Sequence, residues 1–142
     1  MFKNWFKSEE KEERNFVLFL LSDDSSVSTL VQNTLTQQGC TVYSGITVAE
    51  AVKSLDERGL PDVLIVDLYN PEVDGTAFIQ QSRHRFGRSK MPPILFLMDS
   101  PEDEITAEMV EANDLLQKPF EPETLLQCVK TLVERAQPAS TE

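Results

Sequence analysis

The sequence predicts an α/β domain, in which a parallel five-stranded sheet carries helices on both faces. Short apolar runs alternate with segments whose apolar residues recur every three or four positions, five times in about 120 residues. The first run, residues 16–21, is solidly apolar, as expected for a strand that is buried on both faces. The chain has 142 residues, enough for about one domain.

The first two β-α units occupy the N-terminal half of the predicted domain. Residues 16–21 predict the first strand, and the helix predicted over residues 25–38 has one apolar side. Gly39 follows as a typical C-terminal stop. Residues 41–46 predict the second strand, and a capping-box pattern from Thr47 opens a helix that runs to about residue 58.

Three further units complete the pattern. Strands are predicted at residues 63–67, 94–98 and 115–116, and helices at 75–85, from 101 onward and at 121–135. Ser100 is the expected N-cap of the fourth helix and Pro101 its first residue. Together the five units predict one sheet covered by helices, rather than two separate domains.

Composition excludes several classes of partner and compartment. The formal net charge of −11 argues against a nucleic-acid partner, which would require clustered Lys and Arg. The longest apolar run is far too short to span a bilayer. Charged residues at positions 7–14 leave no signal-peptide pattern. Cys40 and Cys128 are far apart in the sequence and predict reduced thiols in a cytoplasmic protein.

The two ends of the chain lie outside the β-α pattern. We expect a flexible N-terminal extension, one domain and a disordered tail, over residues 1–14, 15–136 and 137–142. Phe2, Trp5 and Phe6 have the spacing of one helix face, so residues 1–7 are a candidate for contact with a membrane surface or a partner groove. A flexible extension, or one laid on its own domain, is the alternative.

Charged side chains stand at the ends of three predicted strands. Asp23 and Asp24 follow the first strand, Asp67 ends the third, and Lys118 follows the fifth. Ligands of open α/β sheets bind outside the carboxyl ends of the strands, so we expect these side chains to lie together. Carboxylate oxygens suit Mg²⁺, and a Lys ammonium suits a phosphoryl group. The pattern therefore predicts a site for a divalent cation and a phosphoryl group.

This ordered set resembles the receiver domain of bacterial two-component response regulators. The resemblance covers about residues 15–135 and rests on the acidic pair, on Asp67, on the Pro and Asp-Gly of the next turn, and on Lys118-Pro119-Phe120. It implies a flavodoxin-like (βα)5 fold in three layers, with strand order 2-1-3-4-5. We expect a stand-alone receiver, unless the sequence is part of a longer chain, because no DNA-binding domain is predicted within it.

The resemblance implies a role for each site residue. Asp67 would be the phosphoacceptor, and Lys118 would pair first with its carboxylate and then with the phosphoryl oxygens. Mg²⁺ would be held by Asp24 directly, by Asp23 mainly through water, by Asp67 and by the backbone carbonyl of Tyr69. A histidine kinase or phosphotransfer protein would supply the phosphoryl group. Taken alone, Asp23 or Asp24 is more often an N-cap of the following helix.

Two positions depart from the family pattern. Receivers normally carry Thr or Ser at the end of strand four and an aromatic residue in strand five, where this chain has Met98 and Leu115. A thioether cannot donate a hydrogen bond to a phosphoryl oxygen. Asp99 adds a negative charge that opposes phosphorylation unless it points to solvent. Ser100 is a candidate replacement hydroxyl, although its position before Pro101 favours an N-cap.

Two interpretations of function follow, and a third is weighed against them. In the first, Asp67 is phosphorylated and output uses a nonstandard rearrangement. In the second, the domain is a degenerate receiver that docks partners independently of phosphate. Haloacid-dehalogenase-type phosphatases also use a strand-end Asp but need a second Asp two residues later, where this chain has Tyr69. We therefore expect no enzymatic turnover.

Output is expected to pass through protein contacts on the fourth helix, fifth strand and fifth helix. The last predicted helix has a wide apolar face, formed by Leu125, Leu126, Val129, Leu132 and Val133. Packing on the sheet with one edge partly exposed is one explanation. The other is a docking or homodimer face shared with the fourth helix, which is acidic at Glu104, Glu108 and Glu111.

Overall fold

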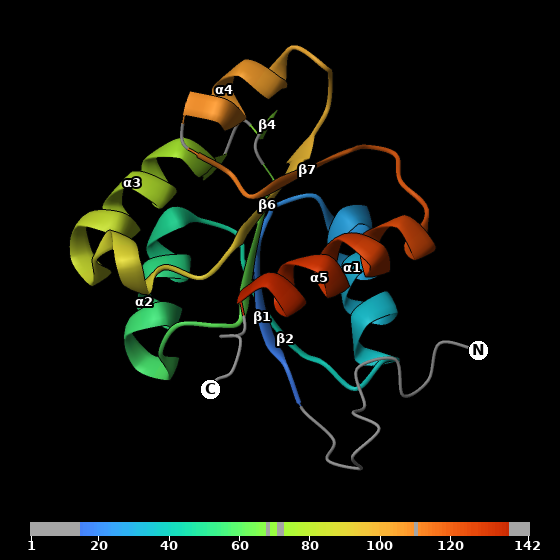
Figure 1. Ribbon diagram of the computed structural model, residues 1–142, viewed down its shortest axis with the longest axis horizontal. Helices are drawn as coiled ribbons and strands as arrows, with labels where there is room; N and C mark the ends of the chain where they lie inside the picture. The colour runs from blue at the N-terminus through green and yellow to red at the C-terminus, as the bar shows by residue number, and fades with distance from the viewer. Residues whose placement is uncertain (1–14, 68, 71–72, 110, 137–142) are drawn as a thin grey trace.

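Five parallel strands form the central sheet of the protein. The computed structural model describes residues 15–67, 69–70, 73–109 and 111–136. The sheet has the order β2-β1-β3-β6-β7, which is 2-1-3-4-5 when its own strands are counted, so the predicted topology is confirmed (Figure 1). Its strands are β1 (Val17–Leu21), β2 (Thr41–Gly45), β3 (Val63–Asp67), β6 (Ile94–Met98) and β7 (Asp114–Gln117).

Helices cover both faces of the sheet and give the predicted three layers. On one side lie α1 (Ser25–Thr36) and α5 (Pro122–Ala136); on the other lie α2 (Val48–Arg58), α3 (Gly75–Phe86) and α4 (Asp103–Met109) (Figure 1). Successive strand residues feed the two cores alternately: Leu18 and Leu20 pack with α1 and α5, whereas Phe19 packs with α2. Because both faces are covered, the three central strands β1, β3 and β6 are apolar except for Asp67, as the sequence indicated.

The caps at the ends of the helices set where the chain turns. Thr47 accepts a hydrogen bond from the Glu50 N–H at 3.1 Å, while the Glu50 carboxylate accepts from the Ile46 N–H at 2.7 Å, so the predicted helix start is confirmed. The first helix ends at Thr36, before the predicted residue 38, and Gly39 follows with φ of 90°. Helix ends fray by one or two residues, so this difference is small.

The segment before α4 differs from the prediction. The helix begins at Asp103, not at Pro101, because residues 101–102 form a turn. The Ser100 hydroxyl accepts from the Glu102 N–H at 3.1 Å, and the Asp103 carboxylate reaches back to the N–H groups of Asp99 and Ser100 at 3.2 and 3.3 Å. Asp103 therefore caps the turn that precedes its own helix. The sequence pattern did not distinguish this arrangement from a helix that begins at Pro101.

Three short elements, absent from the predicted pattern, lie between the main ones. Strands β4 (Tyr69–Asn70) and β5 (Val73–Asp74) pair in antiparallel fashion where the sequence predicted only a turn, and η1 (Arg88–Lys90) is a single turn of 3-10 helix after α3. Two-residue strands are too short to show any alternation of side chains, so the sequence carries no signal for them.

The wide apolar face of α5 is packed in the core. Its five apolar residues are between 0% and 4% exposed: Leu125, Leu126, Val129, Leu132 and Val133. The expected partly exposed edge is therefore not seen, and these side chains offer no apolar docking surface. Among the described residues, the large hydrophobic side chains that are exposed are Ile46 and Met109, at 54% and 77%.

The two cysteines differ in burial. Cys40 is buried and Cys128 half-buried, and both are free thiols. Burial raises the pKa of Cys40 to about 12 and that of Cys128 to about 11.

In the part of the chain that the structure describes, no helix is both long and apolar enough to cross a membrane. The predictions for residues 1–14 and 137–142, including Phe2, Trp5 and Phe6, lie outside the described residues.

Candidate functional site

Asp67 is a buried carboxylate at the centre of the sheet's carboxyl edge. It is the last residue of β3, which lies between β1 and β6, and all five residues of this strand are buried. The Asp67 residue is 0% exposed. Burying an ionised group is costly unless charged or hydrogen-bonding partners meet it, so its neighbours determine its state.

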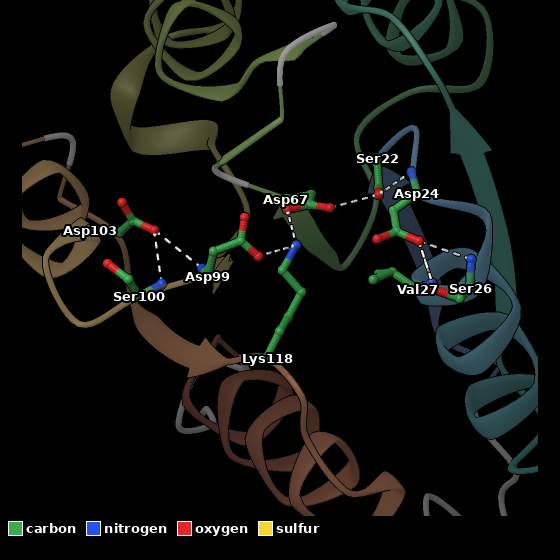
Figure 2. Close-up of polar contacts among 9 residues, drawn as sticks. All are labelled: Ser22, Asp24, Ser26, Val27, Asp67, Asp99, Ser100, Asp103 and Lys118. Carbon is green, nitrogen blue, oxygen red and sulfur yellow. Dashed lines mark hydrogen bonds and ion pairs between the residues drawn. The ribbon is translucent and has the colours of Figure 1, made fainter.

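Lys118 and Ser22 supply those partners from the ends of two other strands. The Lys118 ammonium donates to Oδ1 of Asp67 at 2.8 Å, and the Ser22 hydroxyl donates to Oδ2 at 2.8 Å (Figure 2). Lys118 is itself held by its backbone N–H, which donates to the Met98 carbonyl at 2.7 Å. The predicted convergence of Asp67 and Lys118 is thus seen in the structure, with both carboxylate oxygens engaged.

Ser22 is a site residue that the sequence analysis missed. It follows β1 directly and is buried, at 4% exposed. Besides donating to Asp67, its hydroxyl accepts the Asp24 N–H at 3.1 Å, so it connects the acceptor carboxylate to the start of α1. The only sequence signal was its position between an apolar strand and an acidic pair, which also suits an ordinary turn serine.

Asp99 also approaches Lys118. Its Oδ1 lies 2.9 Å from the Lys118 ammonium, so one cation is shared by two carboxylates (Figure 2). The Lys118 side chain is 14% exposed, whereas that of Asp99 is 40% exposed. The sequence analysis left open whether this carboxylate points to solvent. It is partly exposed but directed at Lys118.

The electrostatics follow from this shared cation. Burial raises the pKa of the Asp67 carboxyl, and the hydrogen bonds from Lys118 and Ser22 offset this only in part. Burial acts to lower the pKa of Lys118, but the hydrogen bonds and charges of Asp67 and Asp99 outweigh it and leave that pKa raised. Lys118 is therefore a firmly charged ammonium that neutralises the buried end of β3.

Asp24 serves as the N-cap of α1. Its Oδ1 accepts from the Ser26 N–H at 3.0 Å, the Ser26 hydroxyl at 2.7 Å and the Val27 N–H at 3.3 Å. These hydrogen bonds, led by that of the Ser26 hydroxyl, lower the pKa of Asp24. The capping role weighed from the sequence is therefore the role that the structure shows for this carboxylate, and Asp23 beside it is half-buried.

The described residues offer few side-chain ligands to a divalent cation. Within the described ranges, no three Asp, Glu, His or Cys side chains are grouped closely enough to hold a metal. Mg²⁺ keeps several waters and is usually held by only one or two carboxylates together with phosphate oxygens. Asp24 and Asp67 carry hard oxygen donors of the kind that this weaker requirement needs, and the Ser22 hydroxyl connects the Asp67 carboxylate to the backbone N–H of Asp24. The backbone of Tyr69 lies in β4, just beyond β3.

A cavity opens beside Lys118. Its volume is about 470 Å³, and its lining includes Asp24, Asp99, Lys118 and Phe120. A second cavity, of about 390 Å³, is lined by Arg83, Glu111 and residues that precede β6 and β7, so it lies at the amino edge of the sheet, away from this chemistry. Of these two cavities, the first is therefore the one that adjoins Asp24, Asp99 and Lys118.

The two atypical positions provide neither a hydroxyl nor an aromatic ring. Met98 ends β6 and is buried, at 7% exposed, and its backbone carbonyl rather than its side chain contacts Lys118. Leu115 is half-buried and packs against the core on the face of the sheet that α2, α3 and α4 cover. Ser100, the candidate replacement hydroxyl, accepts from the Glu102 N–H within its own turn.

Comparison with known proteins gives concordant matches. A family model described as the response regulator receiver domain matches residues 18–130. The chain is 30% identical over 128 residues to the alkaline phosphatase synthesis transcriptional regulatory protein PhoP of Bacillus subtilis, covering 89% of this chain and 52% of that protein. It is 31% identical to the phosphate regulon transcriptional regulatory protein PhoB of Rhizobium meliloti, covering 84% of this chain and 52% of that protein.

Solved structures agree with the sequence relatives. A putative response regulator from Chloroflexus aurantiacus superposes with a TM-score of 0.77 and 30% identity, covering 86% of this chain and all of that one. The chemotaxis response regulator CheY4 of Vibrio cholerae gives 0.74 and 29%, covering 84% of this chain and 99% of that one. The chain spans about half the length of the curated relatives named above.

Proposed function

The chain belongs to the response regulator receiver domain family, and on that premise we propose that it accepts a phosphoryl group on Asp67. In this step a carboxylate oxygen of Asp67 attacks phosphorus and forms the acyl phosphate. The bond from phosphorus to the donor group breaks, and the donor leaves with the electron pair. The donor is a histidine kinase or a phosphotransfer protein, and the output is a change in protein–protein contacts.

The observation that carries the proposal is the environment of the Asp67 carboxylate. Asp67 ends the central strand, its side chain is 1% exposed, and the Lys118 ammonium donates to it at 2.8 Å. An open cavity lies beside Lys118. Phosphoryl transfer depends mainly on positioning and on cations that stabilise the oxygens of the transferred group. Lys118 is positioned to do this, since its flexible side chain can follow the phosphoryl group while its backbone stays bonded to Met98.

Mg²⁺ is the proposed cofactor. Asp24 and Asp67 would hold it, with Asp23 acting through water and the backbone carbonyl of Tyr69 as a further ligand. When bound, the ion supplies positive charge at the phosphoryl oxygens. Oδ1 of Asp24 is engaged at the cap of α1, so its other oxygen is the one available to the ion.

The cellular setting is proposed on the same grounds. The free, high-pKa thiols of Cys40 and Cys128 suit the cytoplasm, where thiols stay reduced. A downstream protein would bind over α4, β7 and α5, through polar and acidic contacts, because the apolar residues of α5 are in the core. The net charge of −11 argues against direct contact with nucleic acid by this domain.

Mass spectrometry tests the proposal directly. The intact chain is incubated with acetyl phosphate and Mg²⁺, and a gain of one phosphoryl group is expected. The Asp67→Asn variant should show no gain, and hydroxylamine, which cleaves acyl phosphates, should reverse the gain in the native chain. A wild-type mass that stays unchanged, in a sample that is folded by circular dichroism, would overturn the proposal.

A degenerate receiver that docks partners without phosphate is the second candidate. The observation that favours it is the occupied site, since Asp24 caps a helix and Asp99 already pairs with Lys118. This function predicts that Asp67→Asn leaves partner binding unchanged. The first function predicts that the same variant removes the response to phosphodonor, so one variant separates the two.

A further inference from the structure

The Lys118 ammonium is shared by two carboxylates that differ in freedom to move. Oδ1 of Asp67 is 2.8 Å away and Oδ1 of Asp99 is 2.9 Å away. The Asp67 side chain is 1% exposed and is also held by the Ser22 hydroxyl, whereas the Asp99 side chain is 40% exposed and stands on a loop. If one carboxylate has to leave, Asp99 can turn into water and Asp67 cannot.

The position of Asp99 is coupled to the start of α4. The Asp99 and Ser100 N–H groups both donate to the Asp103 carboxylate, at 3.2 and 3.3 Å, and Asp103 is the first residue of α4 (Figure 2). The Asp103 N–H in turn donates to the Ser100 carbonyl at 3.1 Å. The Asp99–Lys118 ion pair thus links α4 to β7 across the edge of the sheet.

We propose that Asp99 is a built-in competitor of the phosphoryl group for Lys118, and that phosphorylation of Asp67 expels it and frees residues 99–109. The inference rests on the proposed function, because it names how that site is regulated. In the unmodified chain the Asp99 carboxylate is the anion that the phosphoryl oxygens replace. Asp99 therefore slows acceptance and sets the output.

Charge decides the exchange. Phosphorylation replaces the single charge of the Asp67 carboxylate with about −1.5 to −2 on the phosphoryl group, and it places three acceptor oxygens beside the same ammonium. Charge-assisted hydrogen bonds from an ammonium to phosphoryl oxygens are stronger than hydrogen bonds between neutral groups. The phosphoryl group and the Asp99 carboxylate, both negative, repel each other. Asp99 is the partner that can regain its hydration, so the loop moves outward.

This direction is opposite to the one implied by the family pattern. In receivers with the usual pattern, the hydroxyl at the end of strand four moves toward the phosphoryl group and draws the loop after that strand inward. Met98 has no hydroxyl to do so, and the next residue carries a negative charge that is repelled instead. The exposed Met109 at the end of α4 would then change its surroundings when the segment is freed.

Hydrogen–deuterium exchange of the intact chain tests the inference, with two matched variants. Asp99→Ala removes the ion pair to Lys118, whereas Glu102→Ala removes a charge from the same loop at an exposed position. Unmodified Asp99→Ala should exchange roughly two- to fivefold faster over residues 99–109, as expected for the loss of one partly exposed ion pair. Glu102→Ala should match the wild type.

The phosphorylated wild type should show the same acceleration, and phosphorylated Asp99→Ala should show no further change. Acetyl phosphate should also label Asp99→Ala faster than the wild type, with Glu102→Ala unchanged. Wild-type exchange in Asp99→Ala, or slower exchange over residues 99–109 in the phosphorylated wild type, would overturn the inference.

Intact mass keeps this test separate from that of the proposed function. If neither the wild type nor Asp99→Ala gains a phosphoryl group, phosphoryl acceptance fails, and with it the proposed release. If both gain one but Asp99→Ala does so faster than the wild type, acceptance stands and the competition is supported. If both gain one at equal rates, acceptance stands and the competition is overturned.

Discussion

Two halves of the same sheet edge differ in how well they are equipped for signalling. Around Asp67, a lysine and a serine from the ends of other strands engage both carboxylate oxygens at 2.8 Å. Around Met98, the side chain has no hydrogen-bond donor, and the next residue is an acid paired with Lys118. In the proposed function, acceptance therefore depends on Asp67 and Lys118, whereas the usual reporting hydroxyl is missing at Met98. Asp99 connects the two halves, because it shares Lys118 with Asp67.

The largest effect is expected from Lys118→Ala, which removes the cation from the half of the sheet edge around Asp67, the acceptor half. The change leaves the Asp67 carboxylate buried without its cation, and breaking such a pair costs about 3–5 kcal/mol. Acetyl phosphate labelling should also be lost. Urea unfolding measures the first effect and intact mass the second. Lys53→Ala, on the exposed side of α2, is the control and should change stability by less than about 0.5 kcal/mol.

The pH dependence of Lys118→Ala has a definite sign. Burial raises the pKa of Asp67 above its ordinary value of 3.8, so the folded variant binds more protons than the unfolded chain. The contribution of Asp67 to its stability is greatest below about pH 4 and falls as pH rises through the folded pKa. The penalty relative to wild type should thus be smaller near pH 5 than near pH 8. A penalty independent of pH would show that the uncompensated Asp67 charge is not its cause.

Met98→Thr changes the half of the sheet edge around Met98, the reporting half, and is expected to have a smaller effect. Met98 is 7% exposed, so the shorter side chain removes apolar contacts at the end of β6 and costs about 2 kcal/mol. Labelling by acetyl phosphate should persist, because Asp67 and Lys118 are untouched. Met109→Thr is the control, since that methionine is 77% exposed and its loss should be nearly neutral. Loss of labelling in Met98→Thr would mean that the two halves are not separable.

Two buried serines give the next comparison. The Ser22 hydroxyl donates to Asp67 and accepts from Asp24, so Ser22→Ala should cost about 1–2 kcal/mol. The Ser82 hydroxyl is equally buried but has no hydrogen-bond partner among the described residues, so Ser82→Ala should be neutral or stabilising. Thermal unfolding measures both variants. Equal destabilisation would assign the effect of Ser22 to packing rather than to its bonds with the site.

The parts of the fold that sequence predicted well are those set by burial. Residues 63–67 and 94–98 were placed without error, because each is a solid apolar run bounded by a charged residue or by prolines. The meeting of Asp67 with Lys118 follows from the geometry of a parallel sheet, whose carboxyl ends share one edge. Neither inference needs the orientation of an individual side chain.

The parts that sequence missed depend on such orientations. Ser22 resembles any serine after a strand until Asp67 is seen beside it. The direction of Asp99 depends on whether water or Lys118 holds its carboxylate, and that choice is made by tertiary contact. The start of α4 was predicted at Pro101 with Ser100 as its N-cap, but the helix begins at Asp103, whose carboxylate accepts from the N–H groups of Asp99 and Ser100.

The smallest expected effect, at Asp24, separates helix capping from metal binding. Asp24→Ala should cost about 1 kcal/mol through loss of the α1 cap, whereas Asp24→Asn should keep the cap, because Asn and Asp are equivalent there. Hydrogen bonds lower the pKa of Asp24, so its contribution is present above about pH 4 and is lost as pH falls through the folded pKa. In Asp24→Asn this acid sensitivity should disappear.

Mg²⁺ binding by the same two variants completes the test. Calorimetric titration with MgCl₂ should show weakened binding in both Asp24→Ala and Asp24→Asn, because neither retains the carboxylate that a hard cation prefers. Only Asp24→Ala should also lose stability without metal. If Asp24→Asn binds Mg²⁺ as tightly as the wild type, Asp24 is a cap alone. The acceptor half of the edge would then have to take its cation through Asp23 and Asp67.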